Sequence, residues 1–242
     1  SSLTITEATA VNITGDVTGA VTVEATEVTI DGAVTGDVTV AEGSKLTVTG
    51  AITGAVTVAE GAVLEVNGVD GDLNVGKDAV VTVTGNITGA VTVAEGANVT
   101  VNGNITGDVE VAEGATIAVT GDIAAGKINV AAETFAVTGN IEITSDDAEA
   151  DVVIGKNTEF TLFGDVTGSK VEVVINGNAT FKHTNMPADS KLTVNGNVTI
   201  DTEFMEGIRV SLGNVDNNGN LTVVGGKYVF VYNLDMDGSE TT

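Results

Sequence analysis

The amino-acid sequence predicts an all-β parallel β-solenoid, a β-helix in which three short strands make up each coil of about 18 residues. Three observations predict this fold. Each repeat contains two V-x-V segments and one further, single apolar position. In a β-strand, both valines of V-x-V lie on the same face. Small aliphatic residues dominate and aromatic residues are only 3%, which suits strands. Glycine also recurs every 17 or 18 residues, at Gly32, Gly50, Gly68, Gly85, Gly103, Gly121 and Gly139.

Four segments follow one another along the chain. Residues 1–15 are a strand-like N-terminal extension, and residues 16–139 are a regular solenoid of seven repeats. Residues 140–225 are an irregular continuation of the solenoid with longer loops, and they begin with an acidic insertion, SDDAEAD (145–151). Residues 226–242 are a β-prone tail that lies outside the repeat register.

Five columns of apolar residues run through the seven repeats, and they start at Val17, Val21, Val23, Val28 and Ile30. Because one coil cannot bury its apolar face alone, we expect successive coils to stack and hydrogen-bond at a rise of ~4.8 Å. Core residues recur every six positions, as in left-handed hexapeptide helices. Those helices need small residues at a set inward position that Val91 occupies here, so we expect a right-handed coil.

The charge balance limits the choice of partner. The chain carries 34 acidic and 9 basic residues, a net charge of −25, which repels nucleic acid and anionic membranes. No apolar run approaches the ~20 residues of a membrane-spanning helix. The sequence has no cysteine and begins with Ser1 rather than methionine. We expect an exported, extracellular or cell-surface protein after removal of a signal peptide, although a shortened chain would begin in the same way.

The sequence does not indicate an enzyme or a bound cofactor. Solenoid enzymes that cleave polysaccharides need grouped acids with Arg or Lys and aromatic platforms for sugar rings. This chain has one arginine, Arg209, one histidine, His183, and no tryptophan. We interpret His183 as an exposed loop residue, and the pair Asp146 and Asp147 as an exposed turn.

Three repeating surface features have two interpretations each. The A-E-G corners form a carboxylate row, with Lys77 in its middle, that is either a solvated corner or a diffuse Ca²⁺-binding surface. Threonine rows such as that at Thr29, Thr47 and Thr82 are either exposed strand residues or an ice-binding array, which Glu65 interrupts. The N-x-T sequons are either glycan acceptors or a by-product of repeat copying. The corner carboxylates are Glu42, Glu60, Glu95 and Glu113, and the sequons begin at Asn12, Asn86, Asn98, Asn104, Asn178, Asn197 and Asn220.

Both ends of the chain are strand-like, and neither shows an amphipathic helix that would cap a solenoid. We expect the ends to pair with neighbouring copies, which gives an open head-to-tail polymer. The alternative is that each tail folds back and caps its own end. The candidate assembly residues are Leu3, Ile5, Tyr228, Val229, Phe230, Val231 and Tyr232.

The segment GAVTGDVTVAEGSKLTVTGAITGAVTV (32–58) resembles bactofilins, and the resemblance covers residues 16–139. That resemblance implies a short-repeat right-handed β-helix that polymerises end to end in the cytoplasm. The chain departs from bactofilins in its acidity and in its strand-like tails. It also resembles the Val/Thr/Gly-rich repeats of secreted adhesins and surface-layer proteins, and its acidity and lack of cysteine fit that group better.

The predicted function is a self-assembling extracellular filament or surface-layer subunit whose partner is itself. The alternatives are a monomeric adhesin stalk or ligand-binding surface module with its tip at residues 140–213, a cytoskeletal bactofilin-like polymer and an ice-binding solenoid. Surface glycans are a further candidate partner, whereas nucleic acid and membrane insertion are not expected.

Overall fold

The computed structural model describes residues 2–6, 10–145, 150–182, 184–203, 209–225, 228–231, 233–236 and 240–241. The chain divides into two compact units, unit 1 (residues 1–118) and unit 2 (residues 119–242). Both are all-β parallel solenoids, and no described residue lies in a helix. It follows that no helix in the described part could cross a membrane. The fold class predicted from the repeat is therefore confirmed.

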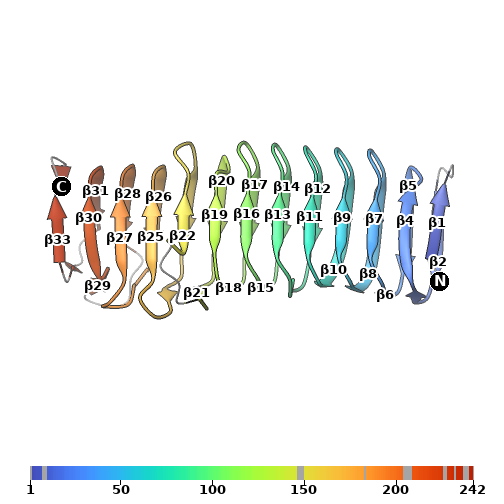
Figure 1. Cartoon of the computed structure of the whole chain (residues 1–242), viewed down its shortest axis with the longest axis horizontal. Coiled ribbons are helices and arrows are strands. Elements are labelled where there is room, and N and C mark those ends of the chain that lie inside the picture. Colours follow the sequence, from blue (N-terminus) through green and yellow to red (C-terminus); the bar gives the residue numbers. More distant parts are fainter. Residues whose placement is uncertain are drawn as a thin grey trace. The chain divides into compact units, whose positions relative to one another are not determined.

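Unit 1 has three sides, and along each side the strands of successive coils pair in parallel (Figure 1). The first sheet contains β1 (Ser2–Thr6), β4 (Ala20–Glu24), β7 (Val38–Val40), β9 (Val56–Val58), β11 (Leu73–Val75), β13 (Val91–Val93) and β16 (Val109–Val111). The second sheet contains β2 (Val11–Thr14), β5 (Glu27–Asp31), β8 (Lys45–Thr53), β10 (Val63–Asp70), β12 (Val80–Val83), β14 (Asn98–Val101) and β17 (Thr116–Val119). The third side consists of β3 (Val17–Thr18), β6 (Val34–Thr35), the ends of β8 and β10, and β15 (Ile105–Thr106).

Unit 2 repeats the three-sided arrangement with longer intervals between paired residues. Its first sheet contains β19 (Ile128–Val130), β22 (Val152–Ile154), β25 (Glu172–Ile175), β27 (Lys191–Val194), β30 (Asn214–Asn217) and β33 (Asn233–Met236). Its second sheet contains β20 (Thr134–Val137), β23 (Glu159–Leu162), β26 (Asn178–Lys182), β28 (Asn197–Asp201), β31 (Asn220–Val224) and β34 (Glu240–Thr241). Its third side contains β18 (Ile123–Ala125), β21 (Ile141–Ile143) and β24 (Val166–Thr167), together with a separate pair, β29 (Arg209–Ser211) and β32 (Tyr228–Phe230).

The register of the strands confirms the stacked columns. Val66 pairs with Val48 on one side and with Val83 on the other, 18 and 17 residues away. All residues of the five predicted columns are at most 3% exposed except Val17, which is half-buried. Since complete burial of one Val, Leu or Ile side chain contributes about 1.5–3 kcal/mol, these columns are the main stabilising feature of the fold.

A sixth buried column, of small residues, lines the corner that follows the A-E-G turn. Its residues are 0–5% exposed. The column was not among the predicted ones, because alanine is not distinctive in a sequence of this composition. In unit 1 its members are Ala25, Ser44, Ala62, Ala79, Ala97 and Ala115.

Larger side chains enter the core of unit 2. Phe135 and Phe160, which pair in register on β20 and β23, stack with ring centroids 5.0 Å apart. Phe181 on β26 meets the Phe160 ring edge-on at 6.0 Å. Phe135 and Phe160 continue the column that starts at Val28, whereas Phe181, which pairs with Leu162, continues the column that starts at Ile30. Aromatic packing thus fills this part of the interior of unit 2.

Glycines at two corners of each coil allow the backbones of neighbouring coils to approach closely. At Gly54, which has a φ of +149°, an added Cβ atom would lie 2.6 Å from the carbonyl carbon and oxygen of Gly36. No real Cβ atom tolerates such contacts, so only glycine fits. Gly61, at the A-E-G turn, differs because nothing lies within 4 Å of an added Cβ and only its φ of +61° favours glycine.

Candidate functional site

The first described coil places the predicted assembly residues Leu3 and Ile5 in the apolar columns. They pair with Val21 and Val23 on β4, and both their side chains face the core. Ile5 is 8% exposed and Leu3 is half-buried, whereas Val21 and Val23 are at most 1% exposed. Strand β1 thus continues the columns while leaving part of their apolar surface open to solvent.

The last described coil shows the same feature more strongly. Leu234 on β33 pairs with Val215 on β30. Val215 is 2% exposed, but Leu234 is 44% exposed. Leu234 therefore occupies a core position of the repeat without the cover that every interior coil receives.

The other predicted assembly residues lie in and beside β32. The backbone of Tyr228, Val229 and Phe230 pairs in parallel with residues 209–211 of β29, so this part of the tail belongs to a coil. Val229 and Val231 are half-buried. Tyr232 lies outside the described residues, and for Tyr228 and Phe230 only the backbone is described. Their role in assembly stays a prediction.

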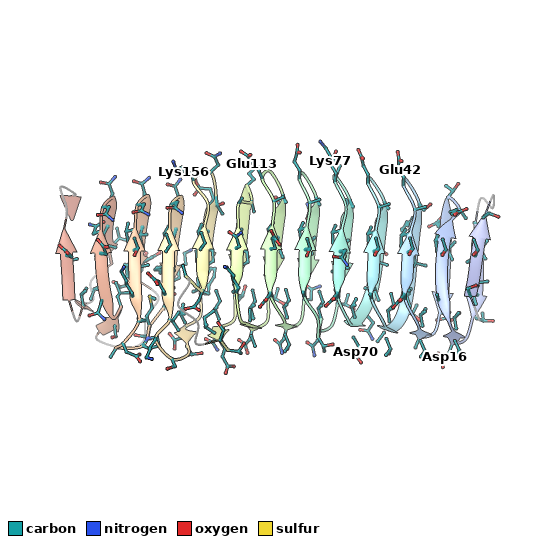
Figure 2. The ribbon with its side chains drawn as sticks, in the orientation of Figure 1. Asp16, Glu42, Asp70, Lys77, Glu113 and Lys156 are labelled. Carbon is teal, nitrogen blue, oxygen red and sulfur yellow. The ribbon has the colours of Figure 1, made fainter. Side chains whose placement is uncertain are left out.

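A row of charged side chains follows the A-E-G corner of unit 1. Figure 2 shows Glu42, Lys77 and Glu113 along one edge of this unit and Asp16 and Asp70 along the opposite edge. The Lys77 Nζ atom lies 3.2 Å from Glu95 Oε1 in the next coil. The hydrogen bond to Glu95, together with the charges of Glu95 and the neighbouring Asp78, raises the pKa of Lys77. Lys77, which the sequence places in the middle of the carboxylate row, thus pairs with a carboxylate of that row.

Two further lysines lie between carboxylates of adjacent coils. Lys45 Nζ is 3.8 Å from Glu27 and 3.5 Å from Glu65. Lys191 Nζ is 3.5 Å from Glu172 and 4.0 Å from Asp216. Exposed pairs of this kind contribute about 0–1 kcal/mol each, so they favour one stacking register more than they stabilise the fold. Among the described residues, no three His, Cys, Asp or Glu side chains converge in a group that could hold a metal ion.

Asp and Asn side chains at two corners of the coil, which sequence reasoning missed, join neighbouring coils. One corner precedes the first-sheet strands and the other precedes the third side, and each Oδ1 atom accepts a hydrogen bond from a backbone N–H one coil further on. In unit 1, Asp37 Oδ1 accepts from Ala55 N at 2.9 Å, and in unit 2, Asp122 Oδ1 accepts from Asn140 N at 2.7 Å. Asp72 makes the same bond at the first-sheet corner, and the further residues that make it at the third-side corner include Asp16, Asn86, Asn140 and Asp165.

Two asparagine ladders, in which an amide of one coil bonds to an amide of the next, follow the N-G-N corners of unit 2. In the first ladder, Asn195 Nδ2 donates to Asn176 Oδ1 at 2.9 Å and Asn218 Nδ2 donates to Asn195 Oδ1 at 3.2 Å. In the second, Asn197 Nδ2 donates to Asn178 Oδ1 at 2.8 Å and Asn220 Nδ2 donates to Asn197 Oδ1 at 2.7 Å. Asn178 in turn donates to Glu159.

The second ladder bears on the predicted glycan sites. Asn178, Asn197 and Asn220 begin N-x-T sequons, and each uses its amide nitrogen, the atom that would carry a glycan, as a donor within the ladder. Asn12 and Asn98 also begin sequons, and both are exposed on strands of unit 1. Glycosylation of any sequon stays a prediction.

The remaining predicted features are dispersed. The threonines Thr29, Thr47 and Thr82 face outward and are half-buried, with the exposed Glu65 between the last two. His183, Asp146 and Asp147 lie outside the described residues, and for Arg209 only the backbone is described.

No family model, curated protein or solved structure matches this chain. The parallel β-solenoid fold follows from the coordinates themselves.

Proposed function

We propose that this protein is a structural subunit of an extracellular filament or surface layer and that its copies assemble head to tail through their terminal coils. One observation carries the proposal. The core columns are closed in the interior coils but partly open at β1 and β33, where Leu3 is half-buried and Leu234 is 44% exposed. A second copy whose β1 pairs with β33 would cover both residues.

Backbone geometry supports such a contact. Within the described residues, β1 pairs with β4 and β33 pairs with β30, each in parallel, so both strands present a further row of N–H and C=O groups. Leu3 and Leu234 belong to the same column of the repeat, and a parallel strand added in that register would continue it. A contact of this kind does not close on itself and therefore produces a filament.

The resemblance of residues 16–139 to bactofilins and to surface-layer repeats supports the same function. The extracellular location rests on the acidic composition and the absence of cysteine. The negative surface charge of the chain repels neighbouring copies, so we expect assembly to increase when added salt screens it.

Sedimentation velocity and negative-stain imaging of the purified chain test the proposal directly. We expect polymers that lengthen with concentration, and we expect Leu234→Lys to abolish them, because the ammonium group would occupy the apolar end of the column. Val80→Lys is the matched control, since Val80 is also 44% exposed but lies on β12, in the interior of unit 1.

Two outcomes would contradict head-to-tail assembly. One is a chain that stays monomeric at high concentration and high salt, which would favour the adhesin stalk or ligand-binding module. The other is a Leu234→Lys variant that polymerises as well as Val80→Lys. Circular dichroism of both variants establishes whether the fold is retained.

A further inference from the structure

A groove of about 470 Å³ runs along the outer face of the second sheet of unit 1. Outward side chains of three successive coils form its two walls, and the buried residues Val48 and Val66 contribute backbone to its floor. One wall comprises Thr47, Glu65 and Thr82, which pair in register on β8, β10 and β12. The other wall comprises Thr49, Asn67 and Thr84.

The groove lies where the repeat is locally irregular. The pairing of β10 with β8 shifts register between Val66 and Gly68, because Thr49 and Gly50 of β8 lie opposite the single residue Asn67 of β10. Asn67 therefore faces a β-bulge on the neighbouring strand. Bulges redirect side chains and are frequent beside binding sites. A second hollow, of about 280 Å³, lies on the other side of Asn67, which lines both. Asn67 is thus the residue shared by the two concave surfaces.

The hydrogen bonds already present in the groove determine what it offers a ligand. Thr84 Oγ1 donates to Asn67 Oδ1 at 3.2 Å, and Thr49 Oγ1 donates to Asp31 Oδ1 at 3.1 Å. Since these hydroxyl protons are in use, the two oxygens face a ligand as acceptors. The carboxylate of Glu65, 3.5 Å from Lys45 Nζ, adds further acceptor positions. The groove therefore presents acceptors at Thr49, Thr84 and Glu65 beside the amide donors of Asn67. It suits a ligand whose hydroxyl groups both donate and accept hydrogen bonds.

The charge of the chain and the direction of the groove walls further limit the class of ligand. Glu65 and the net charge of −25 disfavour an anionic ligand. The three pairs of wall side chains follow the stacking direction over two rises of ~4.8 Å, about 10 Å in all. The groove therefore has room for a short linear segment of a ligand that lies along this direction. From these observations we propose that the groove binds a neutral linear polysaccharide. Binding does not depend on end-to-end assembly, because the groove lies within unit 1 of a single copy.

Fluorescence anisotropy with end-labelled cellohexaose and mannohexaose tests the proposal, with an oligogalacturonate hexamer as the anionic comparison. We expect at least one neutral hexamer to bind and the anionic hexamer to bind at least tenfold more weakly. Asn67→Ala should weaken binding of the neutral hexamer about fivefold, because it removes one hydrogen-bonding group of the groove. Asn102→Ala is the matched control, since Asn102 follows β14 in the same repeat position but outside the groove, and its effect should stay below twofold.

Three results would overturn the proposal. The first is that neither neutral hexamer binds. The second is that the anionic hexamer binds as tightly as the neutral ones. The third is that Asn67→Ala and Asn102→Ala weaken binding equally while circular dichroism shows that both variants are folded.

Discussion

Gly54→Ala tests directly whether close approach of the coils at their corners stabilises the solenoid. Gly54 lies between Thr53 and Ala55, whose backbone atoms make three hydrogen bonds to the preceding coil. Gly36 N donates to Thr53 O at 2.8 Å, Val38 N donates to Ala55 O at 2.9 Å, and Ala55 N donates to Asp37 Oδ1 at 2.9 Å. A methyl group placed 2.6 Å from the carbonyl of Gly36 forces the two coils apart at these bonds.

The expected magnitude follows from those contacts. Weakening three hydrogen bonds at about 1 kcal/mol each, with about 1–2 kcal/mol of backbone strain at a φ of +149°, gives a loss of about 4–5 kcal/mol in the free energy of unfolding. Gly61→Ala is the matched control in the same unit. Its Cβ meets nothing within 4 Å, so only the left-handed conformation contributes, about 1–2 kcal/mol.

Guanidinium unfolding followed by far-UV circular dichroism measures both losses, and native-state hydrogen exchange locates them. Exchange at the amides of Gly36 and Val38 should accelerate in Gly54→Ala and remain unchanged in Gly61→Ala. Equal destabilisation by the two substitutions would refute the reasoning, because it would mean that glycine is needed at both corners only for its backbone conformation. Unchanged exchange at Gly36 and Val38 would refute it as well.

Three further predictions concern the asparagine ladder, the aromatic core and the corner row. Asn197→Asp should lower the free energy of unfolding by about 1–2 kcal/mol, because the new carboxylate cannot donate to Asn178 Oδ1; an unchanged denaturation midpoint would contradict this. Phe160→Ala should cost about 3–5 kcal/mol in denaturant unfolding and Phe160→Leu less than about 2 kcal/mol, whereas equal losses would argue against ring packing. The pKa of Lys77 is raised in the folded state, so its stabilising contribution is complete below about pH 10.5 and is lost as the pH rises through the higher folded value. Across that pH range, the melting temperature of Glu95→Gln should depend less on pH than that of the unsubstituted protein. An equal pH dependence of the two melting temperatures would contradict the stabilising role of the Lys77–Glu95 pair.

The hydrophobic columns could be predicted from the sequence because their burial depends on spacing alone. Once Val48, Val66 and Val83 are 17 or 18 residues apart, parallel stacking places them in register, and the structure pairs them so. Val17 is the exception, since it lies in the third-side strand nearest the start of the chain and is half-buried. The sequence also placed Lys77 in the middle of the carboxylate row, because the A-E-G corners recur at the coil interval and position 77 carries the lysine among them.

Neither the groove nor the ladders could be predicted from the sequence. Both depend on the direction in which the polar side chains of a corner point, and the repeat does not encode that direction. Asn67 reads as one more corner residue in the sequence. Asn67 lies between two hollows where the register shifts, because β8 has one residue more than β10 at this point. The 17-residue interval permits such a shift but does not locate it. In the same way, Asn195 and Asn197 lie two residues apart at one corner, and only the coordinates show that each amide bonds to its counterpart in the coil before it.

The residues that directly precede the first-sheet strands of unit 1, or begin them, form one corner of the coil. The aspartates of this corner show how an acidic chain can stack its coils ~4.8 Å apart. Along unit 1 this position alternates between alanine and aspartate. Asp37 accepts from Ala55 N and Asp72 accepts from Ala90 N, at 2.9 and 2.8 Å, so each aspartate binds the backbone of an alanine-bearing coil. The alternation doubles the separation of like charges from ~4.8 to ~9.6 Å, which halves their repulsion in water from about 0.9 to about 0.4 kcal/mol. The physical repeat at this corner is therefore two coils, although the hydrophobic repeat is one. The members in order are Ala20, Asp37, Ala55, Asp72, Ala90 and Asp108.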